Sequence, residues 1–381
     1  MTRDHMSETA RKPKIVFWGT YDLGKPRNRI LAKALETKEA DITFLHHDVW
    51  TGIEDKSQVS GIGTKIGLAW RWIAGYPKLL WRYACLGHQD AVLVGYPGVL
   101  DVLLLAPIAF IRREKIVWDM FICLYDTVVR DRKKFRKWHP VSVFLYLLEW
   151  VAVRLASYVL MDTKAHAAVV ERLFRLKAGS VGTVYLGVED QVFDITGDKP
   201  QKGSGGPLTI LFYGQFIPLH GIKTIIEAAR LSRDRCYRWV LIGDGQDAGK
   251  IRDMLETTDG DLDIVWKPWV PYSDLSVEIA SADICLGIFG NSEKAASVIP
   301  NKVCQILRCG KPLITRDSPA IRELVETSEV GVKLVPPGNP QKLLDAVRDM
   351  EEEGLPQPRA DLLEIMTQKA ISNDLYKYLL K

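Results

Sequence analysis

The sequence lacks both the cysteine pattern of a zinc site and the apolar leader of an exported protein. None of its six cysteines belongs to a CxxC pair, the spacing that structural zinc sites and redox motifs use. The N-terminal segment MTRDHMSETARKPK is polar and contains no apolar run of the kind that a secretory signal needs. We therefore expect reduced thiols and a cytoplasmic protein.

The chain as a whole also lacks an excess of charge of one sign. Its 51 Lys and Arg residues face 47 Asp and Glu residues, a net charge of +4, which is too small for a nucleic-acid-binding surface. Residues 61–160 alone hold 14 basic and 7 acidic residues. We expect no nucleic-acid partner and one locally basic region.

Two apolar stretches, residues 91–111 and 142–161, approach the length of a membrane span. The first contains Asp101 at its centre and a Pro-Gly turn, which predicts a buried strand followed by a helix. The second contains Glu149 and Arg154, charges that make a span costly, and predicts a core helix followed by a strand. We expect neither stretch to cross a membrane.

Strand-like and helix-like segments alternate along the chain, which predicts parallel sheets with helices on both faces. The first set of expected strands is Lys14–Trp18, Ile42–His46, Ala91–Tyr96, Lys115–Trp118, Tyr158–Met161 and Thr183–Tyr185. The second set is Leu208–Tyr213, Arg238–Ile242, Ile264–Trp266, Ile284–Ile288, Pro312–Thr315 and Gly331–Val335. The fold class is therefore α/β, with two doubly wound halves.

A length of 381 residues fits two domains at roughly 150 residues each. The polar stretch 194–207, rich in Gly and Pro, has the composition of a linker. We predict an N-terminal domain over residues 1–190, a C-terminal domain over residues 191–360 and a terminal helix over residues 361–381. Ligands of such sheets bind at the carboxyl ends of the strands, so functional residues are expected there.

The most informative stretch is residues 287–325, which contains the motif IPNKVCQILRCGKPLITRDSPAIREL at residues 299–324. A helix is expected to begin around Pro300 and Asn301, because proline favours the first turn of a helix. Backbone N–H groups at a helix start bind anions, and Lys302 adds a cation beside them. From the residues alone, an ordinary connection between a strand and a helix remains the alternative.

This motif resembles the donor-site signature of family-4 glycosyltransferases of the GT-B fold. Further segments resemble that family in the same order: IVFWGTYDLG, VYLGVEDQVF, LFYGQFIPLHGIKTIIEAA, IGDGQ and ASADICLGIF. The resemblance extends over roughly Lys14 to Leu380 and is strongest over Leu208–Glu323. It implies two Rossmann-like domains facing a central cleft, with the acceptor on the N-terminal domain, the donor on the C-terminal domain and the terminal helix returning to the N-terminal domain.

The resemblance also implies an activity. Relatives are retaining, metal-independent hexosyltransferases that use a nucleotide-diphosphate sugar as co-substrate and need no tightly bound cofactor, because helix dipoles and cations neutralise the departing diphosphate. A glycan or lipid-linked acceptor, as in polysaccharide or glycolipid assembly, is expected. Two alternatives stay open: a non-catalytic GT-B-like partner associated with a membrane, and a nucleotide-sugar epimerase.

The resemblance assigns donor-binding roles to residues of several loops. These are Gly19, Gly24, Gly214, Gln215, His220, Gly221, Asp244, Ile299, Asn301, Lys302 and Gln305. Family members usually carry glutamates where this sequence has Ser297 and Gln305, and Arg and Lys where it has Gln215 and His220. Gln305 can still hydrogen-bond a ribose, and an adjacent anion raises the pKa of a histidine. The non-catalytic alternative rests on these four departures.

The expected catalytic residues are Glu293, Asp119 and Ser297. Glu293 is the acidic side chain that can enter the sugar pocket, and the alternative is a solvated loop charge. Asp119 ends an expected strand where relatives often have a His-Asp pair, and its alternative is a strand-end cap. Asp244 lies in a Gly-Asp-Gly sequence that by itself predicts only a turn. No strong metal motif is present.

One segment, residues 65–84, has no feature of a nucleotide-binding motif. Residues 65–84 alternate aromatic and basic side chains, the pairing that suits a membrane interface. The expected membrane-facing residues are Trp70, Arg71, Trp72, Trp81 and Arg82, joined by Lys133 and Lys134 of the basic run 130–137. Each Lys or Arg near an anionic leaflet contributes about 1 kcal/mol, which predicts peripheral attachment to the inner face of a membrane. Two solvated helices with partly buried tryptophans are the alternative.

Overall fold

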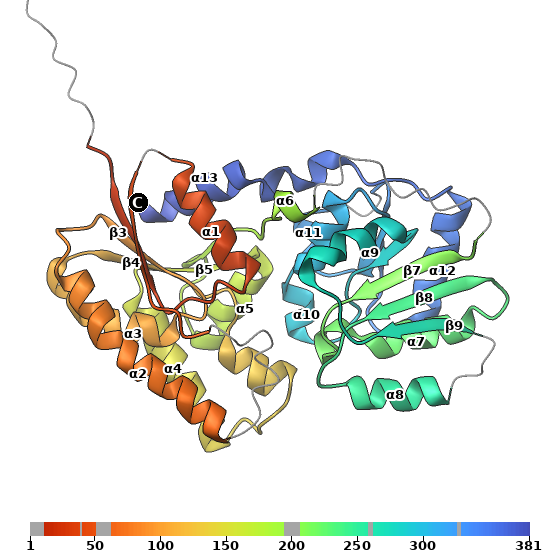
Figure 1. The fold of residues 1–381 in the computed structure, drawn as a ribbon, viewed down its shortest axis with the longest axis horizontal. Helices are drawn as coiled ribbons and strands as arrows, with labels where there is room; N and C mark the ends of the chain where they lie inside the picture. Colours follow the sequence, from red (N-terminus) through yellow and green to blue (C-terminus); the bar gives the residue numbers. More distant parts are fainter. Residues whose placement is uncertain (1–10, 39, 51–61, 194–205, 258–261, 326–328) are drawn as a thin grey trace, which may run out of the picture. The chain divides into compact units, whose positions relative to one another are not determined.

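Two six-stranded parallel sheets form the framework of the protein (Figure 1). The computed structural model describes residues 11–38, 40–50, 62–193, 206–257, 262–325 and 329–381. The first sheet has the order β2-β1-β3-β4-β5-β6 and the second the order β12-β11-β10-β7-β8-β9. This confirms the predicted α/β fold with two Rossmann-like halves.

Each expected strand is present, with small shifts at its ends. The first sheet contains β1 (Lys14–Gly19), β2 (Asp41–His46), β3 (Ala91–Val94), β4 (Lys115–Asp119), β5 (Tyr158–Met161) and β6 (Val181–Thr183). The second contains β7 (Leu208–Tyr213), β8 (Tyr237–Ile242), β9 (Asp263–Lys267), β10 (Ile284–Leu286), β11 (Leu313–Arg316) and β12 (Val332–Val335). Central strands such as β1 and β7 carry near-continuous apolar runs because helices cover both faces.

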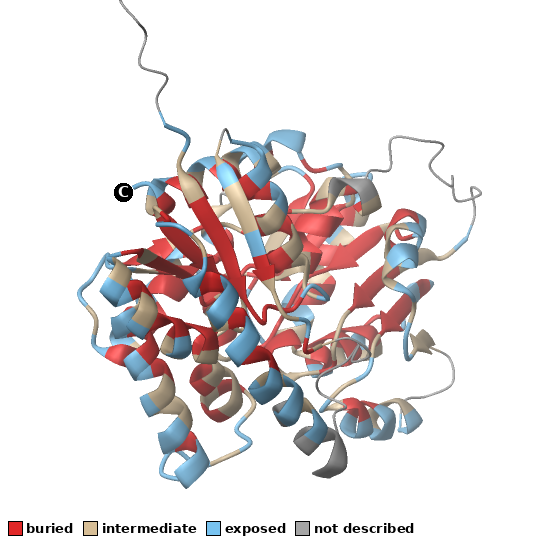
Figure 2. Cartoon of the chain, turned by 60° about the vertical axis from the view of Figure 1, so that its left-hand side comes forward, coloured by how far each residue is buried: buried red, intermediate tan, exposed pale blue. Residues whose placement is uncertain are grey.

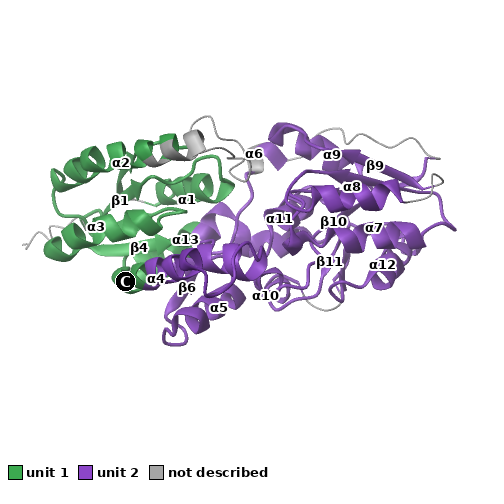
Figure 3. Cartoon of the chain, turned by 90° about the horizontal axis from the view of Figure 1, so that it is seen from below, with its two compact units in different colours: residues 1–120, 151–159, 372–381 green, residues 121–150, 160–371 purple. Residues whose placement is uncertain are grey.

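Contacts divide the chain into two compact units (Figure 3). Unit 1 comprises Met1–Met120, Val151–Val159 and Ser372–Lys381, and unit 2 comprises Phe121–Trp150 and Leu160–Ile371. Unit 2 therefore includes a segment from the N-terminal half of the sequence, Phe121–Trp150, together with the whole second sheet. The predicted domain boundaries remain a prediction.

The second sheet has a separate core on each face. Phe212 and Trp239 pack with α7 (Ile222–Leu231), α8 (Ala248–Glu256) and α12 (Pro340–Glu352). Leu211 and Val303 pack on the opposite face, with α9 (Leu275–Ser281), α11 (Asn301–Arg308) and the 3-10 segment η6 (Ala360–Met366). Neighbouring residues of β7 thus point to opposite faces, as side chains of a strand must. Figure 2 shows the central strands buried beneath helices with exposed outer surfaces.

The terminal helix is shorter than predicted. Instead of one helix over Ala360–Leu380, η6 ends at Met366 and α13 begins at Gln368. Thr367 separates them, and its hydroxyl oxygen accepts a hydrogen bond from the N–H of Ala370 at 3.2 Å, which starts the second helix as an N-cap. Within unit 1, the Tyr376 hydroxyl donates to the Leu35 carbonyl at the end of α1 (Pro26–Glu36) at 2.7 Å.

Among the residues that the structure describes, no helix is long and apolar enough to cross a membrane. Residues 91–111 form β3, a turn and most of α3 (Val99–Arg112), as predicted. Residues 142–161 form most of α4 (Pro140–Leu155) and then β5. The prediction of a core helix is correct for only one face of α4, because Glu149 is fully buried whereas Phe144 is 61% exposed.

Candidate functional site

Three loops of unit 2 meet at the carboxyl edge of its sheet, where ligands of such folds bind. They follow β7, β8 and β10, and glycines allow their backbones to touch. A Cβ on Gly221 would lie 2.5 Å from the carbonyl carbon of Phe289, and one on Gly243 would lie 2.0 Å from the Gly214 oxygen. Any side chain at these positions would therefore separate the loops.

Lys302 lies at the start of α11, beneath this edge. The residue is 5% exposed, and its Nζ lies 3.7 Å from the centre of the Phe212 ring. Nζ is buried and has no hydrogen-bond partner among the described residues. Burial in this setting holds the pKa of Lys302 well below its usual range, because desolvation disfavours the charged form. Asn301 beside it has a buried side-chain oxygen that is likewise unpartnered within the described part of the chain.

His220 approaches Lys302 from the loop after β7. The imidazole is buried, and its Nδ1 is hydrogen-bonded to the carbonyl of Gln215. A Cβ on Gly214 would lie 2.9 Å from Nζ of Lys302 and 3.2 Å from Cε1 of His220. Burial, and then the charge of Lys302, lower the pKa of His220 well below its usual range. The structure thus brings Gly214, His220 and Lys302 together, as the donor-site prediction requires.

Gln305 lies in the same region, but both ends of its amide are engaged. Its oxygen accepts a hydrogen bond from the Tyr213 hydroxyl at 2.9 Å, and its nitrogen donates to the Tyr272 hydroxyl at 3.3 Å. Ile299 is a core residue at 1% exposure. Asp244 is exposed and accepts from the N–H of Gly245 at 2.7 Å, a local contact within the loop after β8.

Glu293 begins the short helix α10 (Glu293–Ser297), and arginines hold its carboxylate. One oxygen lies 2.7 Å from a guanidinium nitrogen of Arg172, and the other is paired with Arg130. The carboxylate is therefore neither a buried catalytic acid nor a free solvated charge. Ser297, at the end of α10, is buried and donates to the carbonyl of Lys294 at 3.0 Å. The catalytic roles of both residues remain predictions.

The remaining predicted site residues belong to unit 1. Asp119 and Arg27 form an ion pair at 2.7 Å in which both side chains are fully buried, a geometry that favours the structural interpretation of Asp119. The N–H of Gly24 donates to Asp22 at 2.9 Å. Gly19 has a positive φ of 129°, and a Cβ there would lie 2.7 Å from a carboxylate oxygen of Asp101.

The predicted membrane-facing residues separate into two groups. Trp70 and Trp81 of α2 (Ile62–Ala84) are both 68% exposed, and Arg71 and Arg82 are also exposed. Trp72 instead turns inward and packs edge-on against Trp50, with ring centres 5.3 Å apart. Lys133 and Lys134 are exposed in a segment that is not helical.

Sequence reasoning missed several residues near the site. Lys294 is buried with its ammonium group bonded to Thr127, and Arg316 is buried with its guanidinium bonded to the Gly290 carbonyl. Arg132 was interpreted only as part of a basic run, yet its positive charge also lowers the pKa of His220. A signal existed for Lys294, since it directly follows the candidate Glu293. None existed for Arg132, which lies in a distant part of the sequence.

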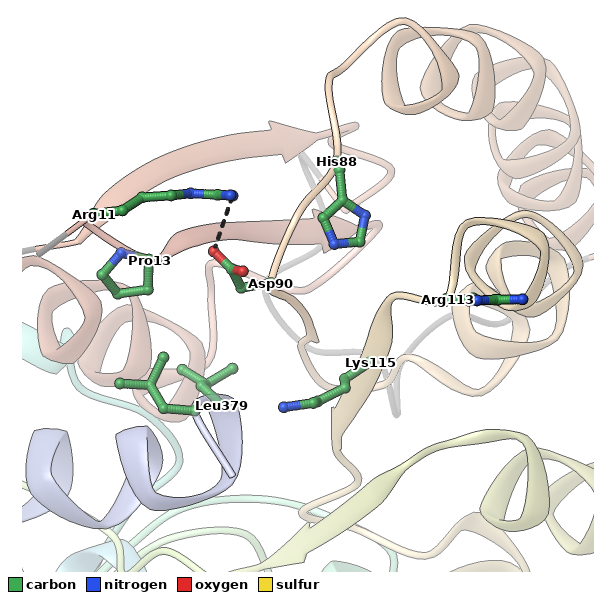
Figure 4. Close-up of a pocket in the computed structure, with 8 residues that line it drawn as sticks. Arg11, Pro13, His88, Asp90, Arg113, Lys115 and Leu379 are labelled. Atoms are coloured by element: carbon green, nitrogen blue, oxygen red, sulfur yellow. Dashed lines mark ion pairs between the residues drawn. The ribbon is translucent and has the colours of Figure 1, made fainter.

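Unit 1 has a pocket of about 370 Å³ at the amino edge of its sheet, beside the first residues of β1, β3 and β4 (Figure 4). Arg11 and Asp90 pair there at 3.6 Å, and Lys115 extends toward Leu379 (Figure 4). The amino edge is not where doubly wound sheets bind ligands. Among the described residues, no group of three or more His, Cys, Asp and Glu side chains is placed to hold a metal ion.

Comparison with known proteins agrees with the fold and with the motif in unit 2. Residues 207–353 match the family described as "Glycosyl transferases group 1". The chain is a glycosyltransferase of the GT-B fold. Anabaena HepE in complex with UDP superimposes on this glycosyltransferase with a TM-score of 0.62 at 15% identity, covering 97% of this chain and 96% of that one.

Two other similarities extend over most of the glycosyltransferase. Sucrose-phosphate synthase from Thermosynechococcus elongatus has a TM-score of 0.65 at 14% identity, covering 97% of this chain and 94% of that one. The chitobiosyldiphosphodolichol beta-mannosyltransferase of Kluyveromyces lactis is 20% identical over 333 residues, which are 76% of this chain and 71% of that protein. The predicted GT-B fold and the glycosyltransferase class are therefore confirmed, and residues 207–353 carry the family match.

Proposed function

We propose that this glycosyltransferase moves a hexose from a nucleotide-diphosphate donor to an acceptor, with retention of configuration and without a metal ion. The observation that carries the proposal is the buried Nζ of Lys302, which has no hydrogen-bond partner in the described part of the chain. Burying a charge without a partner is costly. A site that retains such a group fits a ligand that supplies the missing negative charge.

The surroundings of Lys302 suit a diphosphate. The start of α11 offers backbone N–H groups, which favour anions. His220 lies close by, and Gly214 leaves open the space that a side chain would fill. Fixed cations and dipoles that face a departing diphosphate stabilise the charge that develops as the glycosidic bond breaks. The donor therefore binds unit 2, and the reaction proceeds mainly through positioning and leaving-group stabilisation.

The comparisons support a nucleotide donor and a glycan acceptor. The matched HepE structure contains UDP, and the Kluyveromyces lactis relative is named for a dolichol-linked substrate. A lipid-linked acceptor places the enzyme at a membrane surface. The exposed side of α2 fits that location, because Trp70, Ile73 and Trp81 are at least 60% exposed beside Arg71 and Arg82. We propose that this face docks on anionic lipid at the cytoplasmic surface of a membrane.

A product assay tests the activity. The enzyme is incubated with UDP-, GDP-, ADP- and TDP-hexoses, with and without polyprenyl-diphosphate-linked glycans, and nucleotide release is measured. Acceptor-dependent release that Lys302→Ala abolishes is expected. Epimerised or hydrolysed donor without acceptor would support the epimerase instead. Proton NMR of the new linkage tests retention, and a product anomer opposite to that of the donor would contradict it.

Vesicle flotation tests the membrane surface separately. We expect the protein to float with vesicles containing phosphatidylglycerol, and the double variant Trp70→Ser/Trp81→Ser to remain at the bottom of the gradient. Trp269→Ser is the matched control, because Trp269 is 66% exposed but belongs to unit 2. Equal loss in the control, or no flotation of the unsubstituted protein, would contradict docking through α2.

A further inference from the structure

A π-helix from the N-terminal half of the sequence packs against residues 292–294 of unit 2, which we call the donor-site loop. This helix, η2, spans Asp126–Asp131. Thr127 bonds the ammonium group of Lys294, Arg130 pairs with Glu293, and an oxygen of Asp131 lies 2.6 Å from the Ser292 hydroxyl. π-Helices are rare and frequent at functional sites. Three consecutive residues of the donor-site loop are therefore held by one helix.

Arg132 follows directly after this helix. Its N–H donates to the Thr127 carbonyl at 2.9 Å, five residues back, which continues the π geometry. Its carbonyl accepts from the Gln246 side chain at 3.4 Å, in the loop after β8. Both contacts hold the Arg132 backbone beside the carboxyl edge of the second sheet. The side chain therefore starts from a fixed position next to the three converging loops.

Asp131 is an acid on which the charge of Arg132 acts, and the Arg132 side chain is itself half-buried. Its Nε is buried without a hydrogen-bond partner among the residues described. It lies near enough to His220 for its charge to act on that imidazole. The neighbouring acids have other partners, since Asp131 bonds Ser292 and Glu293 pairs with Arg130 and Arg172. Arg132, His220 and Lys302 thus form a cluster of basic groups.

Such a cluster is unfavourable unless an anion binds it, because like charges repel and burial increases the cost. A diphosphate carries enough charge and enough acceptor oxygens to satisfy three basic groups. Arginine is suited to this role, since its planar fork binds two phosphate oxygens at once. The loop after β7 itself contributes only His220 and the neutral Gln215.

We propose that Arg132 is a diphosphate-binding residue of the donor site, which supplies from the N-terminal half of the sequence a cation that the loop after β7 lacks. The inference rests on the proposed donor site. It assigns Arg132 to ligand binding and leaves the adjacent Lys133 and Lys134, which are exposed, outside the site.

Titration calorimetry with UDP, GDP, ADP and TDP, and with the matching monophosphates, tests the assignment. For the diphosphate that binds, Arg132→Gln should weaken affinity by about tenfold to a hundredfold, the range of a lost charge-assisted hydrogen bond. The loss should be smaller for the monophosphate, and Arg132→Lys should restore part of it. Lys133→Gln is the matched control from the same basic run and should bind like the unsubstituted protein.

The outcomes separate the inference from the proposed function. Unchanged diphosphate affinity in Arg132→Gln, with binding lost in Lys302→Ala, would overturn the role of Arg132 and keep the donor site. If none of the four diphosphates binds the unsubstituted protein, the proposed donor site fails and the inference with it. Thermal melting of Arg132→Gln checks folding, and an unchanged or higher Tm is expected because repulsion within the cluster decreases.

Discussion

The loops after β1 and β7 share a backbone feature but bury opposite charges. Gly19 is the last residue of β1 and Gly214 directly follows β7, and both have a positive φ, 129° and 132°. At Gly19 the space is occupied by the carboxylate of Asp101, and at Gly214 by the ammonium group of Lys302. Glycine is needed in both places, because a Cβ would lie less than 3 Å from these groups.

The two buried charges differ in how they are satisfied. Asp101 accepts hydrogen bonds from the N–H of Thr20 at 3.0 Å and from the Tyr76 hydroxyl at 2.9 Å. Lys302 has no such partner among the described residues. A satisfied buried charge holds its loop in place, whereas an unsatisfied one is available to a ligand. The loop in unit 1 is therefore a structural element, and we propose that the loop in unit 2 is the binding element.

The largest effect is expected from removing the satisfied charge. Asp101→Ala leaves the donors of Thr20 and Tyr76 without an acceptor, at about 2–4 kcal/mol of unfolding free energy. Urea unfolding followed by circular dichroism measures it. Asp101→Asn keeps an acceptor and should lose less. A loss below about 1 kcal/mol in Asp101→Ala would show that the loop does not depend on this carboxylate.

Removing the unsatisfied amine of Lys302 should instead stabilise the protein. Lys302→Met replaces a desolvated amine with an apolar chain of similar length and should raise the free energy of unfolding by about 1–3 kcal/mol. The same urea experiment applies, with Lys223→Met as control because Lys223 is 73% exposed. Destabilisation by Lys302→Met would mean that the contact of the ammonium group with the Phe212 ring outweighs the cost of burying it, contrary to the comparison.

Binding of a diphosphate should be coupled to proton uptake. Burial lowers the pKa of both Lys302 and His220, and a bound anion raises both again. The complex then holds more protons than the free enzyme, so affinity falls as pH rises through the lowered pKa values, by at most about tenfold per pH unit for each proton. Calorimetry in buffers of different ionisation enthalpy measures the uptake. Equal heats in all buffers would contradict it.

The smallest effect is expected at a cation that lies beside the loop but outside the site. Lys223 follows Gly221 closely in sequence, yet its ammonium group is exposed and lies 3.6 Å from Glu227. Such surface pairs contribute little, about 0–1 kcal/mol. Diphosphate affinity of Lys223→Gln should stay within about twofold of the unsubstituted protein. A larger loss of diphosphate affinity would place Lys223 in the binding site. It would contradict the claim that the buried cations, and not the exposed ones, bind the diphosphate.

Local pattern was enough to predict much of the fold and the position of Lys302 at the start of a helix. The strand Leu208–Tyr213 was predicted with its observed bounds, because a short apolar run lies between Pro207 and Gly214. Lys302 was predicted as an anion-binding residue because Pro300 signals a helix start there. The break at Thr367 was missed although threonine is a common N-cap. The prediction ignored this N-cap signal because the residues on both sides of Thr367 follow a helical pattern.

Pairings between distant residues could not be predicted from sequence. Gln305 stands where relatives carry a glutamate, but nothing in the motif shows that Tyr213 and Tyr272 engage its amide. Asp119 pairs with Arg27 because two segments of unit 1 meet in its core. Arg132 belongs to a basic run that predicts a charged surface. Only the three-dimensional packing of η2 places it beside the proposed donor site.

The most direct test of the central claim is a thermal-shift titration of the unsubstituted protein and Lys302→Met with UDP, GDP, ADP and TDP. A ligand that binds only the folded state raises Tm. The account predicts that one diphosphate raises the Tm of the unsubstituted protein, whereas Lys302→Met melts higher without ligand and does not respond to it. Equal shifts in both proteins would show that the unpartnered lysine is not the diphosphate site and would contradict the account.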